Sequence, residues 1–127
     1  MEATRMTPEE ELIQRYFDTF NCHDIDGVMA CFHENPVIVD ATGTRFEGRG
    51  EVRRHYETGF AAMPDSRCDL RTLTGNSGRG LAESFFHGTR QGRNQVIEAI
   101  GAEVIDVVEG KIKEIRDYHR PLPARAA

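Results

Sequence analysis

The sequence lacks a long hydrophobic run, an excess of basic residues and an apolar leader, and each absence excludes a class of protein. No apolar stretch approaches the roughly 20 residues of a transmembrane helix. The formal net charge of −5 argues against nucleic acid or a membrane surface as partner, because proteins that bind them normally carry a basic surface. The N-terminal residues have no signal-peptide core. These features predict a cytoplasmic protein.

Cysteine is also scarce. Cys22, Cys31 and Cys68 are odd in number, and their spacing fits neither a disulfide framework nor the paired pattern of a zinc site. Reduced thiols are the simplest interpretation. The sequence therefore predicts no metal.

What is present is typical of one soluble globular domain. The chain has 127 residues, of which 39% are apolar and 29% charged, and this length suits a single core but not two. No internal repeat, low-complexity segment or linker divides it. We expect one domain over residues 1–127, with residues 1–6 and 121–127 flexible.

The first half has helical signals. The segment Thr7–Glu10 combines a capping residue, a proline at the first helical position and a glutamate that completes a capping box. Apolar residues then recur at helical spacing until about residues 21–23. Asp24 is expected to cap a short second helix, which Pro36 ends. A third helix is expected over Glu51–Met63.

The second half has the pattern of an antiparallel sheet. Strands are expected over residues 67–73, 81–90, 95–108 and 111–119, and glycine-containing turns separate them. Helices followed by such a meander predict an α+β domain. A curved sheet wrapped over helices would leave a cone-shaped cavity, which is a common small-molecule site.

One acidic residue follows a short apolar strand near the middle of the chain. In the segment Asn35–Gly43, the run Val37–Val39 has high β-propensity and leads into Asp40 and a glycine turn. Asp40 could simply face solvent. Alternatively it projects into a pocket, where apolar walls raise its pKa and make it a usable proton acceptor.

With these segments placed, the chain resembles the NTF2-like superfamily and, within it, the ketosteroid isomerase and SnoaL-like group. The resemblance implies a cone-shaped α+β barrel that pairs into homodimers through its sheet face. It covers almost the whole chain. The residues that carry it are Ile13–Phe17, Asn21–Gly27, Phe32, Val37–Asp40, Gly48–Tyr56 and Glu109–Arg116.

The resemblance also implies roles for individual residues. Tyr16 falls where steroid isomerases keep the tyrosine that hydrogen-bonds the developing enolate oxygen, and Asp40 falls on the catalytic base. Tyr56 falls on a tyrosine that supports the first. The second oxyanion donor corresponds either to Gly101 or to Glu103, and Glu103 is preferred because turns absorb length changes more readily than paired strands.

The last strand carries two further polar residues. Alternation places Asp117 and His119 on one face with Ile115, and Arg116 and Tyr118 on the other. The resemblance turns the first face toward the cavity, where the pair is similar to the equipment of dehydratases. Both residues could instead lie in solvent near the strand end. A metal held by Asp40, Asp117 and His119 is conceivable, but the fold rarely uses one.

The remaining predicted site residues are apolar or supporting. His55 is expected to line or to cover the cavity. The apolar lining is expected from the phenylalanines Phe17, Phe20, Phe60, Phe85 and Phe86.

Three functions remain open from the sequence. The first is an enzyme, without cofactor, that transfers a proton next to a carbonyl of a small apolar ligand, as an isomerase or cyclase, or as a dehydratase-like lyase. Asp40 would be the base, Tyr16 the oxyanion donor, and Asp117 and His119 auxiliary groups. The second is a binding protein of the same fold without catalysis. The third is an assembly protein whose cavity is filled by phenylalanine side chains.

Overall fold

The computed structural model describes residues 5–127, and its first two helices begin where the sequence provides capping side chains. Helix α1 (Pro8–Asn21) starts with a capping box. The backbone N–H of Glu10 donates to the Thr7 hydroxyl over 3.1 Å, and the backbone N–H of Thr7 donates to the Glu10 carboxylate over 2.9 Å. Asp24 caps the short helix α2 (Ile25–Ala30). Both helix starts agree with the sequence prediction.

The strands form one mixed sheet in the order β2-β1-β6-β5-β4-β3. Strand β1 pairs parallel with β6, and the other neighbours in this order are antiparallel. The described strands are β1 (Phe32–Val39), β2 (Arg45–Glu47), β3 (Arg67–Asn76), β4 (Arg79–Arg90), β5 (Gln95–Val108), β6 (Lys111–Asp117), β7 (Arg120–Pro121) and β8 (Arg125–Ala126).

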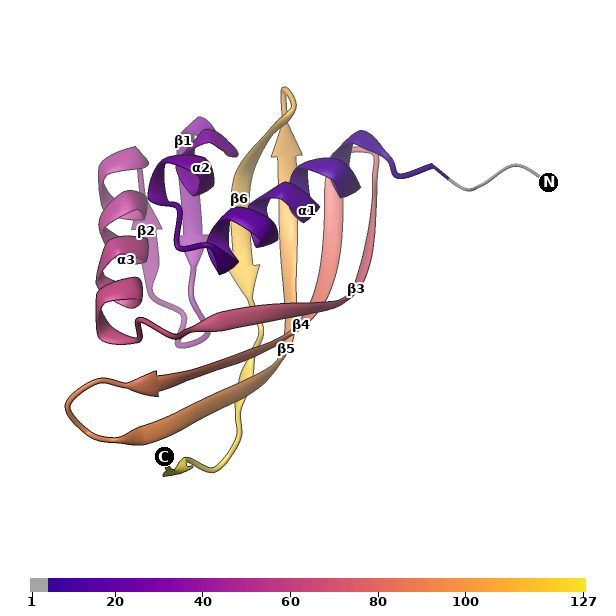
Figure 1. Cartoon of the computed structure of the whole chain (residues 1–127). Coiled ribbons are helices and arrows are strands. Elements are labelled where there is room, and N and C mark those ends of the chain that lie inside the picture. The colour runs from indigo at the N-terminus through magenta and orange to yellow at the C-terminus, as the bar shows by residue number, and fades with distance from the viewer. Residues whose placement is uncertain (1–4) are drawn as a thin grey trace.

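The sheet bends around the helices (Figure 1). Helix α1 crosses the concave face of the long strands, and α3 (Arg49–Ala62) lies beside β1 and β2. Apolar side chains of α1, α3 and the inner sheet face form one core, which includes Ile13, Phe17, Val52, Ile105 and Ile112. Because β2 and β3 remain at the two edges, the barrel is open. This architecture is the α+β, NTF2-like fold that the sequence predicts.

The prediction that Pro36 ends the second helix is wrong, because α2 already ends at Ala30 and Pro36 lies within β1. The strand starts at Phe32, which pairs with Ile112 on β6, and the register shifts between Phe32 and Val37. Proline has no N–H to donate to a ladder, so it fits at such an irregularity. Helix α3 likewise starts at Arg49, two residues before the expected Glu51.

The hairpins also differ slightly from expectation. Strand β3 runs on to Asn76, and the turn consists of Ser77 and Gly78, with φ angles of 53° and 83°. Positive φ at both central residues gives a turn whose twist matches that of the strands. Strand β5 has the bounds that the sequence predicts, and Glu109 and Gly110, with φ angles of 54° and 74°, close the next hairpin.

The C-terminal residues pair with the sheet, and their flexibility stays a prediction. Strand β6 ends at Asp117, before the expected His119, and β7 and β8 then pair with β5. In this register Arg120 lies opposite Ile100, and Arg125 lies opposite Val96. The expectation of a flexible N-terminus falls mainly on residues 1–4, which lie outside the described residues.

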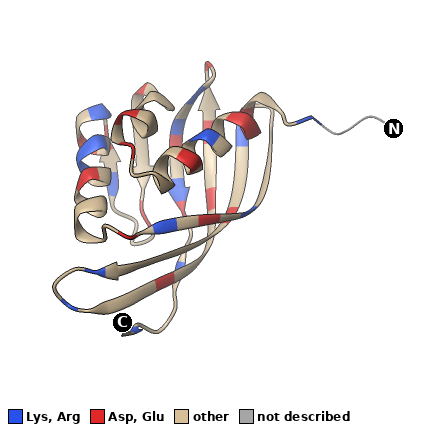
Figure 2. Ribbon diagram, in the orientation of Figure 1, with Lys and Arg blue, Asp and Glu red and all other residues tan. Residues whose placement is uncertain are grey.

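Charged residues of both signs are spread over the helices and strands (Figure 2). Within residues 5–127, no helix combines the length and the apolar character that crossing a membrane requires.

Candidate active site

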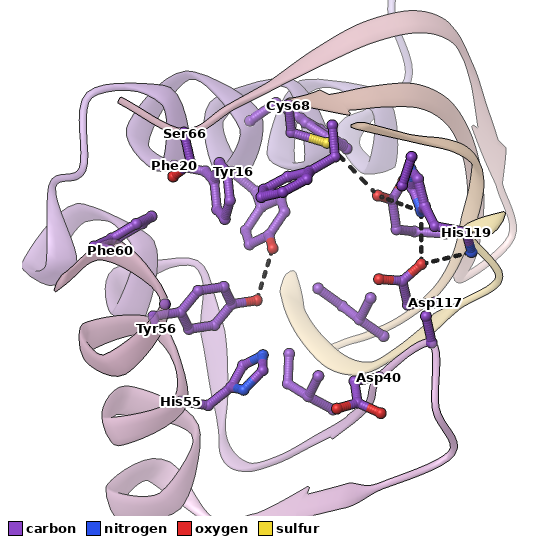
Figure 3. A pocket seen from close by; sticks show the side chains of 18 of the residues that line it. Tyr16, Phe20, Asp40, His55, Tyr56, Phe60, Ser66, Cys68, Asp117 and His119 are labelled. Carbon is purple, nitrogen blue, oxygen red and sulfur yellow. Dashed lines mark hydrogen bonds and ion pairs between the residues drawn. The ribbon is translucent and has the colours of Figure 1, made fainter. Parts of the chain in front are cut away.

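A cavity of about 330 Å³ lies between the concave sheet face, α1 and α3 (Figure 3). Its walls are mainly aromatic and aliphatic, and a few polar groups converge in it, which is the usual composition of a small-molecule site. The apolar lining includes Phe17, Phe20, Ile38, Phe60, Met63, Phe86 and Ile115.

Two tyrosine hydroxyls meet inside this cavity. Tyr16 on α1 and Tyr56 on α3 are both buried, and their hydroxyl oxygens are 2.6 Å apart. Burial raises the pKa of both phenols well above the ordinary value, so both stay neutral at pH 7. One hydroxyl donates to the other, which leaves a single O–H free to donate to a ligand.

Asp40 lines the cavity, but its pKa is not raised as expected for the second of the two alternatives considered from the sequence. Burial does raise it, yet hydrogen bonds from Thr42 and Thr44 outweigh burial, so the pKa of Asp40 is lowered. The backbone N–H and hydroxyl of Thr42 donate to Oδ1 over 3.0 and 2.7 Å, and the backbone N–H of Thr44 donates to it over 3.0 Å. The short turn after β1 thus keeps Asp40 ionised.

His119 and Asp117 face the cavity together. Asp117 Oδ1 is 2.6 Å from Nδ1 of His119, and Nε2 is 2.9 Å from the Ser84 hydroxyl. Burial alone lowers the pKa of His119, but the bond to Asp117 and neighbouring acids raise it to about 10. The imidazole is therefore protonated at neutral pH. Tyr118 points outward and is 62% exposed, so the predicted alternation of this strand is correct.

Glu103 projects from β5 into the cavity and is buried. The Ser84 hydroxyl donates to its carboxylate over 2.9 Å. Burial raises the pKa of Glu103 to about 7, although the charge of His119 opposes this. At Gly101 a side chain would overlap the backbone of Tyr118 and His119. Of the two positions considered for the second oxyanion donor, only Glu103 therefore reaches the cavity.

The supporting residues come from α1, α3 and β4, and one of them lies outside the cavity. His55, Phe20, Phe60 and Phe86 line the cavity as expected, and burial lowers the pKa of His55. Phe85 does not line it. Its ring lies on the outer face of the sheet, where the Arg71 guanidinium is 5.3 Å from the ring centre.

Comparison with known proteins places the whole architecture in a family. The family model described as a SnoaL-like domain matches residues 13–115. This chain belongs to the SnoaL-like domain family. A search of curated proteins found no match.

Solved structures share the fold of this SnoaL-like domain at low sequence identity. A candidate polyketide cyclase from Xanthomonas campestris is 24% identical, with a TM-score of 0.78 over 87% of this chain and 90% of that one. A candidate SnoaL-like polyketide cyclase from Jannaschia is 14% identical, with a TM-score of 0.79 over 95% and 90%. An LEH-like epoxide hydrolase of Mycobacterium tuberculosis is 15% identical, with a TM-score of 0.79 over 91% and 84%.

The sequence did not reveal two residues of the SnoaL-like cavity. Ser84 and Cys68 extend the polar group around His119, with the Cys68 thiol donating to the Ser84 hydroxyl over 3.2 Å. A small polar residue in a strand carries no signal of its own. Strand pairing is what would have indicated these two residues. Cys68 lies opposite Phe86, and Ser84 lies opposite Gly101, so both residues are on strands that line the cavity.

Proposed function

We propose that this SnoaL-like chain is an enzyme that transfers a proton next to a carbonyl of a small apolar molecule, as an isomerase or cyclase does. The observation that carries the proposal is an apolar cavity in which a neutral tyrosine pair and an ionised carboxylate both line the wall. A carboxylate can take a proton from carbon while a phenol stabilises the oxyanion that forms.

The residues divide the work as follows. The free O–H of the Tyr16 and Tyr56 pair donates to the ligand's carbonyl oxygen, and the charge that develops there strengthens this bond. Asp40 accepts the proton. The described bonds within its turn all end on Oδ1, so Oδ2 is available as base. The low pKa makes Asp40 a weaker base but keeps it in the accepting form.

Hydrogen exchange next to a carbonyl tests this without knowledge of the natural substrate. We expect the protein, kept in EDTA, to catalyse exchange of the α-hydrogens of α-tetralone in D₂O, followed by NMR. Asp40→Asn removes the base and should slow exchange by about 100-fold or more. Tyr16→Phe removes an oxyanion donor and should cost roughly 100-fold.

Asp18→Asn is the matched control, because Asp18 is an exposed α1 residue outside the cavity lining. Exchange that is equally fast in Asp40→Asn and in the control would rule out Asp40 as base. If 2-naphthol binds in the cavity while neither tetralone exchange nor the dehydration described below occurs, the result would favour a binding protein. The open cavity gives no support to the third hypothesis, a cavity filled by phenylalanine side chains.

A dehydratase-like reaction is a second candidate, and the contact between His119 and Asp117 favours it. A protonated imidazole can donate a proton to a leaving hydroxyl, and Asp117 at 2.6 Å orients it. The probe is the β-hydroxy ketone diacetone alcohol, whose dehydration gives a conjugated ketone visible in the ultraviolet. Loss of this reaction in His119→Gln, with tetralone exchange retained, would favour the dehydratase.

A further inference from the structure

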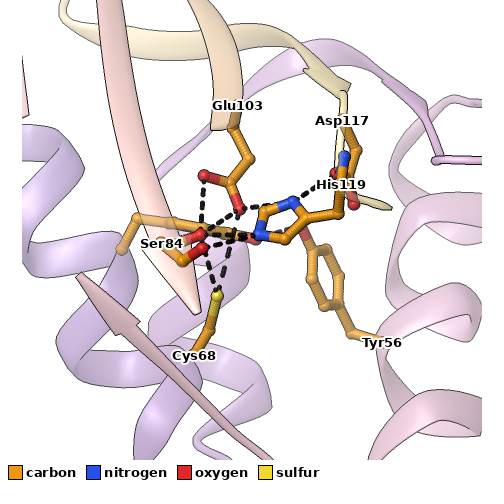
Figure 4. A network of polar contacts seen from close by, with 7 residues as sticks. Tyr56, Cys68, Ser84, Glu103, Asp117 and His119 are labelled. Carbon is orange, nitrogen blue, oxygen red and sulfur yellow. Dashed lines mark hydrogen bonds and ion pairs between the residues drawn. The ribbon is translucent and has the colours of Figure 1, made fainter. Parts of the chain in front are cut away.

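Four side chains from neighbouring strands converge beside the cavity (Figure 4). Cys68 comes from β3, Ser84 from β4, Glu103 from β5, and His119 from the segment that follows β6. Cys68, Glu103 and His119 line the cavity. Paired strands hold three of these residues, so the cluster is part of the rigid sheet.

The Ser84 hydroxyl lies at the centre of this cluster. It is 3.2 Å from the Cys68 sulfur, 2.9 Å from Oε1 of Glu103 and 2.9 Å from Nε2 of His119. A hydroxyl has one hydrogen, which it gives to Glu103, and it accepts hydrogens from the thiol and the imidazole. The Ser84 hydroxyl thus occupies the position between the thiol, the carboxylate and the imidazole that a bound cation would take.

The donor atoms match one metal in particular. A thiolate, an imidazole nitrogen and a carboxylate oxygen are the usual ligands of Zn²⁺, at about 2.0–2.3 Å from the ion. The three donor atoms here lie within 4.8 Å of one another. Shifts of about 1 Å in the positions of the donor atoms would bring them to zinc-binding distance. Rotation of the Ser84 side chain about χ1 would move its hydroxyl out of the position of the ion.

Asp117 supplies the supporting contact that metal-binding histidines normally have. It accepts a hydrogen bond from Nδ1 of His119 over 2.6 Å and also from the backbone N–H of the same residue over 2.9 Å. This arrangement fixes the ring so that Nε2 points at the Ser84 hydroxyl, which lies between Cys68 and Glu103. A carboxylate on the second nitrogen orients the ring and increases its basicity toward a metal.

We propose that Cys68, Glu103 and His119 form a mononuclear Zn²⁺ site whose fourth position opens into the cavity. Binding forms one bond each to sulfur, nitrogen and oxygen and releases the thiol proton and the Nε2 proton to solvent. An open fourth position would take water or the ligand's oxygen. The site shares the cavity with Tyr16 and Asp40 but uses neither of them.

Cobalt binding tests the site directly, because Co²⁺ takes the place of Zn²⁺ and is coloured. We expect the metal-free protein to bind one equivalent of Co²⁺, with a thiolate charge-transfer band and the visible bands of tetrahedral cobalt, and Zn²⁺ to abolish both. Cys68→Ser should remove the charge-transfer band. Cys22→Ser should leave it unchanged, because Cys22 is exposed and outside the cavity.

The variant Asp117→Asn tests whether Asp117 positions His119 for metal binding or only supports the fold. It retains all three ligands, and we expect 10- to 100-fold weaker Co²⁺ binding with the charge-transfer band unchanged in position. Circular dichroism shows whether each variant is folded, and Glu103→Gln replaces Cys68→Ser if the latter does not fold. Absence of the thiolate band in the unmodified protein, or its persistence in Cys68→Ser, would overturn the proposal. Tetralone exchange is measured in EDTA, without metal. The proton-transfer proposal and the zinc proposal can therefore fail independently of each other.

Discussion

At the scale of single residues, Glu103 and His119 have raised pKa values that make the stability of the protein depend on pH. Oε1 of Glu103 is 3.7 Å from Nδ1 of His119, and both side chains are nearly inaccessible. The pKa of Glu103 is raised to about 7 and that of His119 to about 10. For both groups the folded state binds protons more tightly than the unfolded chain does. Each therefore favours folding at low pH and loses this contribution as pH rises.

We expect the free energy of unfolding to fall as pH increases through two windows. Glu103 contributes between its ordinary pKa and about pH 7, and His119 contributes between its ordinary pKa and about pH 10. Urea unfolding at a series of pH values measures this. Glu103→Gln should flatten the lower window and His119→Gln the upper one. A profile that rises across both windows would contradict the raised pKa values.

At the scale of elements, the turn that follows β1 lowers the pKa of Asp40. The hydroxyl of Thr42 donates to Oδ1 over 2.7 Å and lowers the pKa of that carboxyl. Burial in the cavity wall raises the pKa of Asp40, and the hydrogen bonds of the turn lower it by more.

Removing that hydroxyl should strengthen Asp40 as a base. We expect Thr42→Ala to raise the pKa of Asp40 toward its ordinary value, as measured by carboxyl ¹³C NMR titration. The lost bond to an ionised group is worth about 1.5–3 kcal/mol where it is shielded and less at this partly exposed position. Thr89→Ala is a control on the distant β4. An unchanged Asp40 titration in Thr42→Ala would show that the backbone bonds alone set its pKa.

Local sequence signals predicted the elements whose causes are local. The capping box at Thr7, the Asp24 cap and the bounds of β5 all follow from neighbouring residues, and the structure contains each of them. The start of β1 and the pairing of the C-terminal residues depend on strands that are distant in sequence. The sequence pattern within residues 32–36 and 120–127 does not indicate which strands they pair with.

The candidate site divides in the same way. The alternation of Asp117 and His119 and the helical faces that carry Tyr16 and Tyr56 are local, so their convergence on one cavity was predictable with the family resemblance. The lowered pKa of Asp40 depends on hydrogen bonds within a turn whose geometry the sequence does not specify. The involvement of Ser84 and Cys68 required the register of three strands.

At the scale of the whole molecule, the outer face of the sheet carries exposed apolar side chains. Leu81 is 43% exposed, Ile100 37% and Tyr118 62%. They lie on β4, on β5 and just after β6, which are neighbours in the sheet. The family resemblance implies pairing through this face.

We therefore expect a homodimer that depends on the outer face. Analytical ultracentrifugation should give twice the chain mass of 14.3 kDa, and Tyr118→Glu should shift the protein toward the monomer, because a charge buried in an apolar interface is costly. Glu57→Gln on the outer surface of α3 is the matched control. A monomer at micromolar concentration in the unmodified protein would contradict the expectation.

The glycine at position 101 allows the end of the chain to approach β5 closely. Because it has no side chain, the backbone of Tyr118 and His119 can rest directly on β5. A side chain at position 101 would push this backbone away from β5 and would move the His119 imidazole out of the cavity. The absence of one methyl group therefore allows the end of the chain to contribute a side chain to the cavity.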